Sequence, residues 1–308
     1  MNRKLLRQAL PFMSLAIVLV ATFIVQPRTM SYFGLNLMLQ YAVPIALATI
    51  AQMCVITAND LDLSIGPFVG LVTCIGATLL LDTPILGVMA LLVLIAAYAA
   101  IGALIEYRNL PSIVVTLGLA FVWLGMAVLI LPSPGGKAPA FLKSLMGVQV
   151  PLIPFPIIAA VVIAVAAHLL LMKTSFGVIA RGAGGNARAL TRAGWSMLKT
   201  RAVLYACAGF FGVLSGLSLL GLTTSGDAHV ADRYTLYSIA GVILGGGEFI
   251  GGRVSPMGAV VGAITLALAG SFLIFLKISP DWQIGAQGAI LIIVLALRAL
   301  VSRQEAQA

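Results

Sequence analysis

Residues 84–105 read PILGVMALLVLIAAYAAIGALI and contain no charged side chain. A helix rises about 1.5 Å per residue, so a run of this length crosses a hydrocarbon core of about 30 Å. Similar apolar runs recur along the whole chain. They give ten candidate spans, at about 8–26, 34–57, 65–81, 84–105, 113–131, 151–172, 201–222, 235–247, 256–276 and 282–300. The eighth is short, and a count of eight applies if two of the runs are re-entrant.

The composition agrees with a chain that faces lipid rather than water. Apolar residues make up 61% of the 308 residues and charged residues only 9%, against about 25% charged residues in a typical soluble domain. So few polar side chains cannot cover a water-exposed surface, which excludes an ordinary soluble enzyme. Because the spans use nearly all of the chain, we expect a single all-α domain over 1–308, a polytopic integral membrane bundle.

The distribution of basic residues predicts the orientation of this bundle. With the N-terminus inside, thirteen Lys and Arg residues fall on the cytoplasmic side and five outside, as the positive-inside rule requires. The thirteen are Arg3, Lys4, Arg7, Arg108, Lys173, Arg181, Arg188, Arg192, Lys199, Arg201, Arg253, Arg298 and Arg303, and the five are Arg28, Lys137, Lys143, Arg233 and Lys277. An even number of spans also places the C-terminus in the cytoplasm. The net charge of +9 therefore marks loops and not a nucleic-acid partner.

Three segments interrupt the apolar pattern, and the first is Asn59-Asp60-Leu61-Asp62-Leu63-Ser64-Ile65-Gly66. Each Asp would cost about 2.5–3.5 kcal/mol in the hydrocarbon core, so both carboxylates must meet water, polar protein or a helix end. In one interpretation Asp62 or Ser64 caps the following helix. In the other, the segment belongs to a transport pathway.

The second segment is the long connection from Thr174 to Thr200. Asn186 is a good N-cap and Gly194 a good residue after a C-cap, which predicts a short helix over 187–193. Its apolar positions, Leu190 among them, lie on one side and its basic positions on another. The basic positions are Arg188 and Arg192. Either the segment is a solvated basic loop, or this helix binds a soluble partner.

The third segment is rich in glycine and contains one opposite-charge pair. It is predicted to be a flexible cytoplasmic turn, a hinge or a partner contact, since such a composition does not sustain a helix. Its residues are Gly245, Gly246, Gly247, Glu248, Phe249, Ile250, Gly251, Gly252 and Arg253.

Motifs for catalysis or metal binding are missing from the sequence. It contains no G-x-x-x-x-G-K-[ST] phosphate loop, no G-x-S-x-G elbow and no cluster at metal-ligand spacing. The three cysteines lack CxxC spacing, which argues against a zinc site. We expect no catalytic residue, no metal and no cofactor.

Four motifs together resemble the membrane permease subunits of bacterial ABC importers, in particular the ribose/xylose-type sugar permeases related to branched-chain amino acid permeases. The first is Asp62-Leu63-Ser64-Ile65-Gly66. The others are Phe176-Gly177 through Gly184-Gly185-Asn186 to Gly194, Gly251-Gly252-Arg253 leading into Gly258 and Gly262, and Ser279-Pro280-Asp281-Trp282-Gln283. Asn59 and Asp60 depart from the Gly-Gly or Gly-Ile that commonly precedes Asp-Leu-Ser in this family.

The resemblance implies a non-catalytic permease in the bacterial inner membrane that imports a small polar solute, a monosaccharide or polyol, by alternating access. It also implies three kinds of protein partner: a cytoplasmic ATPase, a second permease copy or paralogue, and a periplasmic binding protein. Segment 174–200 would couple to the ATPase through Gly184, Gly185, Asn186, Arg188, Leu190, Arg192 and Gly194. Candidates for the translocation pathway or inner gate are Gln52, Asn59, Asp60, Asp62, Ser64, Trp282 and Gln283. The alternatives are an ion-coupled secondary transporter and a permease for branched-chain amino acids.

Overall fold

The computed structural model describes residues 3–278, 282, 285, 288 and 289, and the regular structure in this part is helical. Within this part no strand forms, and an isolated bridge joins Gly135 and Gly226. The α-helices are α1 (Arg3–Val25), α2 (Tyr32–Leu39), α3 (Ala42–Thr57), α4 (Ile65–Ala77), α5 (Leu79–Asp82), α6 (Pro84–Arg108), α7 (Ser112–Ile130), α8 (Ala140–Met146), α9 (Phe155–His168), α10 (Ser175–Arg192), α11 (Met197–Thr223), α12 (Tyr234–Leu244) and α13 (Pro256–Phe275). A 3-10 turn, η1 (Pro27–Met30), and a π-helical turn, η2 (Leu169–Lys173), complete them.

The predicted spans coincide with these helices. Nine of the ten apolar runs are helical, and the tenth, 282–300, lies outside the described residues apart from four positions. Seven helical segments of the described chain are long and apolar enough to cross a membrane. The all-α prediction is confirmed for the described residues, whereas ten crossings and cytoplasmic termini stay predictions.

The run at 235–247 forms a helix of half the length that a crossing needs. Helix α12 has 11 residues, which at about 1.5 Å per residue cover roughly half of a hydrocarbon core. Gly245 is its C-cap, because the glycines that follow do not sustain the helix. The expectation of a full span at this position is therefore not supported.

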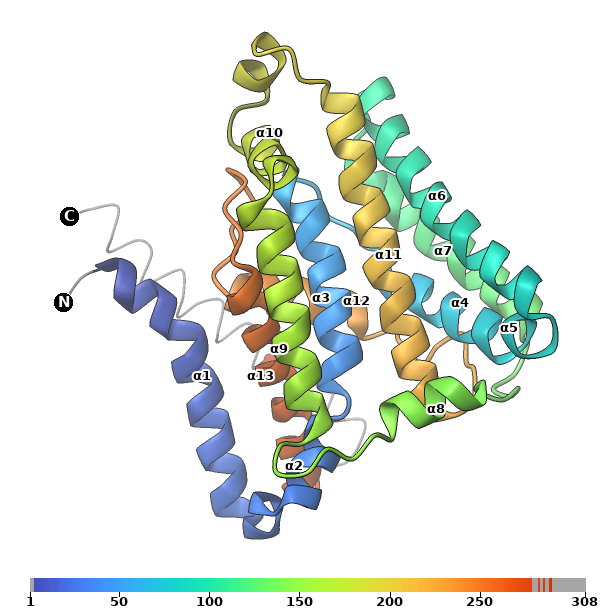
Figure 1. Ribbon diagram of the computed structural model, residues 1–308, viewed down its shortest axis with the longest axis vertical. Helices are drawn as coiled ribbons and strands as arrows, with labels where there is room; N and C mark the ends of the chain where they lie inside the picture. Colours follow the sequence, from blue (N-terminus) through green and yellow to red (C-terminus); the bar gives the residue numbers. More distant parts are fainter. Residues whose placement is uncertain (1–2, 279–281, 283–284, 286–287, 290–308) are drawn as a thin grey trace.

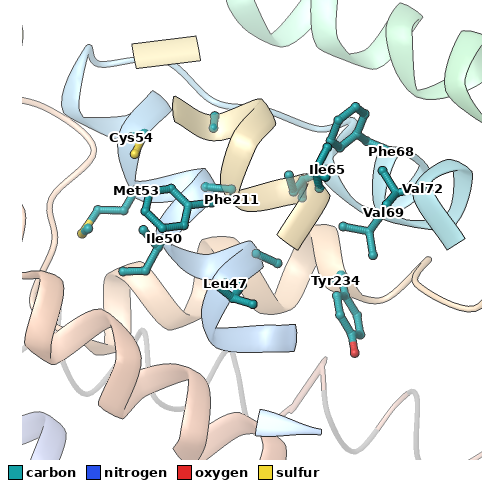
Figure 2. Packing of buried hydrophobic residues seen from close by; sticks show 14 of the residues in the cluster. Leu47, Ile50, Met53, Cys54, Ile65, Phe68, Val69, Val72, Phe211 and Tyr234 are labelled. Atoms are coloured by element: carbon teal, nitrogen blue, oxygen red, sulfur yellow. The ribbon is translucent and has the colours of Figure 1, made fainter. Parts of the chain in front are cut away.

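Helix α3 forms the centre of the bundle. All 16 of its residues are buried, as its apolar sequence on every side predicts for a core helix. It packs against α11, α12 and α13, and Figure 1 shows it between α9 and α11. Figure 2 shows Ile50 and Met53 of α3 beside Phe211 of α11, within one cluster of buried side chains.

Helices α6 and α7 form part of the outer surface. Large apolar side chains on both are exposed, among them Leu92 and Val93 of α6 and Val114 and Phe121 of α7. An apolar surface of this extent is unstable against water and suits acyl chains. These two helices therefore present a lipid-facing side.

The two short helices α4 and α12 begin inside the bundle. An extended stretch leads from the end of α3 to α4, and both short helices lie about midway between the ends of the molecule in Figure 1. The Gly66 N–H near the start of α4 donates a hydrogen bond of 3.0 Å to Thr235 Oγ1 of α12. The beginnings of the two helices are thus joined directly.

Candidate functional site

The predicted short helix in segment 174–200 is present, with a cap at each end. Within α10, Asn186 has a non-helical φ of −155° and ψ of 85°, and its Oδ1 accepts a hydrogen bond of 3.0 Å from Ala189 N. Gly194, after the helix, has a φ of +87°, which glycine adopts without strain. The helix over 187–193 is confirmed to within one residue, and we call it the short helix.

The short helix projects from the bundle at the end where α3 ends and α10 lies, called here the α10 end (Figure 1). Arg188 and Arg192 are exposed and Leu190 is half-buried. Trp195, just beyond the helix, is 50% exposed. An exposed aromatic ring and two exposed guanidinium groups within eight residues offer both apolar area and charge to a protein partner.

The first half of α10 was not predicted. Residues 175–185 are helical although they include four glycines, a composition that disfavours helix in isolation. Tertiary contacts favour the helical conformation of these residues. A Cβ on Gly184 would overlap the Thr57 carbonyl oxygen and lie 2.8 Å from Gly252 Cα, so the backbones of three segments pack directly on one another.

The three pattern-breaking segments meet at this contact. Asn59 Nδ2 donates a hydrogen bond of 2.7 Å to the Gly184 carbonyl, and the Gly251 N–H donates one of 3.0 Å to Asn59 Oδ1. A Cβ on Gly252 would overlap the Arg181 carbonyl oxygen. One amide side chain therefore links the α3–α4 connection, α10 and the glycine-rich turn, and we call this contact the Asn59 junction.

The glycine-rich turn 245–253 is a defined structure. Glu248 N donates a hydrogen bond of 2.9 Å to the Arg253 carbonyl, and their side chains form an ion pair of 3.5 Å. Positive φ angles occur at Gly246, Gly251 and Gly252, where only glycine fits without strain. The turn is closed on itself and rests against α10.

Asp60 is held by an ion pair. Arg201 Nε lies 2.9 Å from Asp60 Oδ2, a close charge contact rather than a linear hydrogen bond, and Arg201 Nη1 lies 2.6 Å from Glu106 Oε2. Asp60 is only 6% exposed. A single guanidinium thus joins the beginning of α11 to the end of α6 and to the α3–α4 connection.

Asp62 is buried without a cation beside it in the described structure. Its Oδ1 accepts hydrogen bonds from Ser64 N (2.7 Å) and Ser64 Oγ (2.6 Å), and its Oδ2 accepts one of 2.8 Å from the Tyr98 hydroxyl. The Gln52 amide, in the orientation that satisfies both of its ends, pairs with the Asp62 backbone N and O. Ser64 occupies the N-cap position of α4, but its side chain forms no capping bond. The capping interpretation is wrong, because the Ser64 hydroxyl bonds Asp62 and the Gly66 N–H bonds Thr235 Oγ1.

Two pathway candidates, Trp282 and Gln283, have no recorded contact with this group in the described structure. Trp282 is 75% exposed, and Gln283 lies outside the described residues. Gln52, Asn59, Asp60, Asp62 and Ser64 all lie on or against the α3–α4 connection. The described residues contain no group of three or more His, Cys, Asp or Glu side chains that could hold a metal ion.

Sequence reasoning missed the partners of this group, among them Tyr98, Glu106, Arg201, Tyr205 and Thr235. Arg201 was assigned to the same side as the neighbouring basic loop, which placed it near the acids, but nothing indicated a pair. Tyr98 lies in an apolar run whose pattern does not distinguish a buried hydroxyl from a lipid-facing one.

The Tyr98 hydroxyl provides a direct test of the Asp62 network. We expect Tyr98→Phe to lower the free energy of unfolding by about 1–3 kcal/mol, because Asp62 Oδ2 loses its donor while it stays buried. The thermal unfolding midpoint of the purified protein in detergent measures this. Tyr107→Phe on the same helix is the control, since Tyr107 is 70% exposed. Equal midpoints for the two variants would contradict the network.

Comparison with known proteins identifies the family of this chain. Residues 34–295 match the model of the family described as branched-chain amino acid transport system / permease component. The chain belongs to this permease family. It is a multi-pass membrane protein by its relatives and its seven apolar helices.

The permease is similar to curated proteins along most of its length. It is 27% identical to the probable ABC transporter permease protein YphD of Escherichia coli, over 88% of this chain and 82% of that protein. It is also 27% identical to the galactose/methyl galactoside import permease protein MglC of Haemophilus influenzae, over 86% and 85%. Identity to the ribose import permease protein RbsC of Bacillus subtilis is again 27%, over 93% and 91%. No solved structure matches the chain.

Proposed function

We propose that this chain is the membrane subunit of an ATP-binding cassette importer that carries a monosaccharide or polyol from periplasm to cytoplasm across the bacterial inner membrane. The observation that carries this proposal is the capped, exposed short helix at the α10 end. It projects from the bundle, so a soluble partner can bind it and move it. Family membership and the sugar names of the galactose and ribose permeases support the substrate class.

The α10 end is the cytoplasmic end in this proposal. The basic residues of segment 174–200 and Arg201 lie there, in keeping with the positive-inside rule. Because the sequence has no phosphate loop, ATP is hydrolysed by a separate partner. Residues 1–308 then act as one transmembrane domain. The coupling segment comprises Gly185, Asn186, Arg188, Leu190, Arg192 and Gly194, with the buried Gly184 at its base.

Alternating access requires the α3–α4 connection to change its packing. Gln52, Asp62 and Ser64 are fully or nearly fully buried in this structure, so solute reaches them only when the connection opens. A partner drives such a change only if it contacts the two states with different free energies. ATP binding and hydrolysis in the ATPase supply that difference through the short helix. Glycines at 245–247 and 251–252 would serve as the hinge.

The other partners follow from the importer class. A periplasmic binding protein delivers solute at the opposite end of the molecule, and a second copy of this chain or a paralogue completes the pathway. The exposed apolar side chains of α6 and α7 contact the bilayer.

The coupling segment is tested by reversing one charge on the short helix. We expect Arg188→Glu to reduce solute-stimulated ATP turnover by at least about tenfold, since one reversed charge in a protein interface costs a few kcal/mol. Gly194→Pro should act in the same direction by removing the positive-φ residue after the helix. The purified complex of permease and ATPase, in nanodiscs with loaded binding protein, provides the measurement.

Lys143→Glu is the matched control, because it makes the same charge change on α8 at the other end of the bundle. It should leave association with the ATPase unchanged. Normal assembly and normal solute-stimulated turnover in both short-helix variants would overturn the coupling assignment.

Asp62 supports a second candidate, an ion-coupled secondary transporter. A buried carboxylate that lacks a neighbouring cation in the described structure is the kind of group that binds a coupling ion. Uptake that collapses with a proton uncoupler while ATP is held constant would favour this candidate. Within the importer class, the ligand retained by the binding protein distinguishes a sugar from a branched-chain amino acid.

A further inference from the structure

Asn59 combines an unusual backbone conformation with two hydrogen bonds from its side chain. Its φ is +63°, in the left-handed region that asparagine tolerates better than most residues. Its side-chain amide combines N–H donors on nitrogen with a carbonyl oxygen that accepts. The donor bonds Gly184 and the acceptor is bonded by Gly251, residues 125 and 192 positions away along the chain.

The partners of Asn59 belong to segments with different connections. Gly184 precedes the kink at Asn186, so it lies at the base of the short helix. Gly251 belongs to the turn between α12 and α13. Asn59 itself is followed by Asp60 and Asp62, whose contacts lead to α11, α6 and the start of α4. Asn59 therefore lies between the base of the short helix and the contacts that lead to α4, α6 and α11.

We infer that Asn59 is a positioning residue for transport, the link through which movement of the short helix reaches the α3–α4 connection and the glycine-rich turn. The inference rests on the proposed function. It assigns Asn59 a mechanical role at the coupling end rather than contact with solute. Glycine-to-backbone contacts at Gly184 and Gly252 keep the segments adjacent, and the Asn59 amide fixes their relative register.

Two substitutions test the side-chain amide of Asn59 independently of its backbone conformation. Asn59→Gly keeps the positive φ and removes both hydrogen bonds. Asn59→Asp keeps the acceptor for Gly251 but replaces the donor to Gly184 by an oxygen, so one bond is lost and two oxygens face each other. Because the Asn59 side chain is exposed, we expect both variants to insert and to bind the ATPase.

Asn109 provides a matched control. It has a φ of +51° at the end of α6 and is exposed, and the described structure gives its side chain no hydrogen bond. Asn109→Gly thus makes the same chemical change at an equivalent backbone position without touching the junction.

The experiment compares these variants as complete complexes in nanodiscs with ATPase and sugar-loaded binding protein. We expect Asn59→Gly and Asn59→Asp to lower solute uptake per ATP hydrolysed by about tenfold, the scale set by one or two neutral hydrogen bonds. ATPase stoichiometry should match that of Asn109→Gly, and the unfolding midpoint should fall only slightly below it, because the hydrogen bonds are lost from an exposed side chain. A merely structural role would lower the midpoint and leave uptake per ATP unchanged in the folded fraction.

The outcomes distinguish this inference from the proposed function. If Arg188→Glu abolishes stimulation while both Asn59 variants keep wild-type uptake per ATP, the role of Asn59 is overturned and the importer stands. If neither the Arg188 nor the Asn59 variants alter coupling, both proposals are wrong. If Asn59→Gly fails to fold, Asn59→Asp, which is isosteric, decides between these outcomes.

Discussion

The Arg201→Met permease should unfold far more readily than the wild type, with a loss of about 3 kcal/mol or more in the free energy of unfolding. Removal of one partner from a buried ion pair typically costs about 3–5 kcal/mol, because the other charge stays desolvated. Here two carboxylates are left. Asp60 is 6% exposed and lies 2.9 Å from the guanidinium, while Glu106 is 28% exposed, so most of the loss arises from Asp60.

The measurement is the fraction of monodisperse protein that survives heating in detergent, followed by size-exclusion chromatography. Arg188→Met removes the same side chain from an exposed position and should be neutral. The triple variant Asp60→Asn, Glu106→Gln, Arg201→Met should recover most of the lost stability, since it leaves no unpaired charge. An Arg201→Met protein as stable as Arg188→Met would show that these ion pairs do not hold α6, α11 and the α3–α4 connection together.

Features with a local signal were predictable from sequence. An apolar run that is long enough to cross a membrane predicts a helix whatever its packing partners are. The run that begins at Pro84 is an example, since α6 is helical over 84–108. The signal for the short helix was also local, because Asn186 and Gly194 cap its two ends without contacts from other segments. Caps depend on residues within one turn, so the sequence carries them directly.

Features that depend on distant partners were not predictable in this way. Asn59, Gly184 and Gly251 each broke the hydrophobic pattern, but no periodicity connects residues more than a hundred positions apart. The glycine-rich half of α10 is helical where Thr57 and Gly252 pack against it, contacts that its composition does not announce. Charge counting placed Arg201 on the cytoplasmic side at the start of a span, and that rule says nothing about ion pairs. The sequence thus identified which segments were exceptional, and the fold showed that they meet.

Two adjacent glycines in α10 should respond to alanine in opposite ways. We expect Gly184→Ala to lower the free energy of unfolding by about 1–3 kcal/mol or more, the usual range for overpacking, because the added Cβ would overlap the Thr57 carbonyl oxygen, a backbone atom that no rotamer change can move. At Gly185 the nearest atom to an added Cβ is Gly251 O at 3.5 Å, an ordinary contact. Gly185→Ala should therefore be neutral or stabilising by up to about 1 kcal/mol, through the lower entropy of the unfolded chain.

Thermal unfolding midpoints of the two alanine variants in the same detergent provide the test, and the difference between them matters more than either value. Both substitutions add one methyl group and both remove one glycine from a helix, so propensity alone predicts stabilisation at both positions. Only direct backbone contact between α10, the end of α3 and the glycine-rich turn predicts a loss at Gly184 and none at Gly185. A stabilised Gly184→Ala protein would mean that α10 does not rest on the bundle at this point, and a short helix without such a base could not transmit force to the membrane helices.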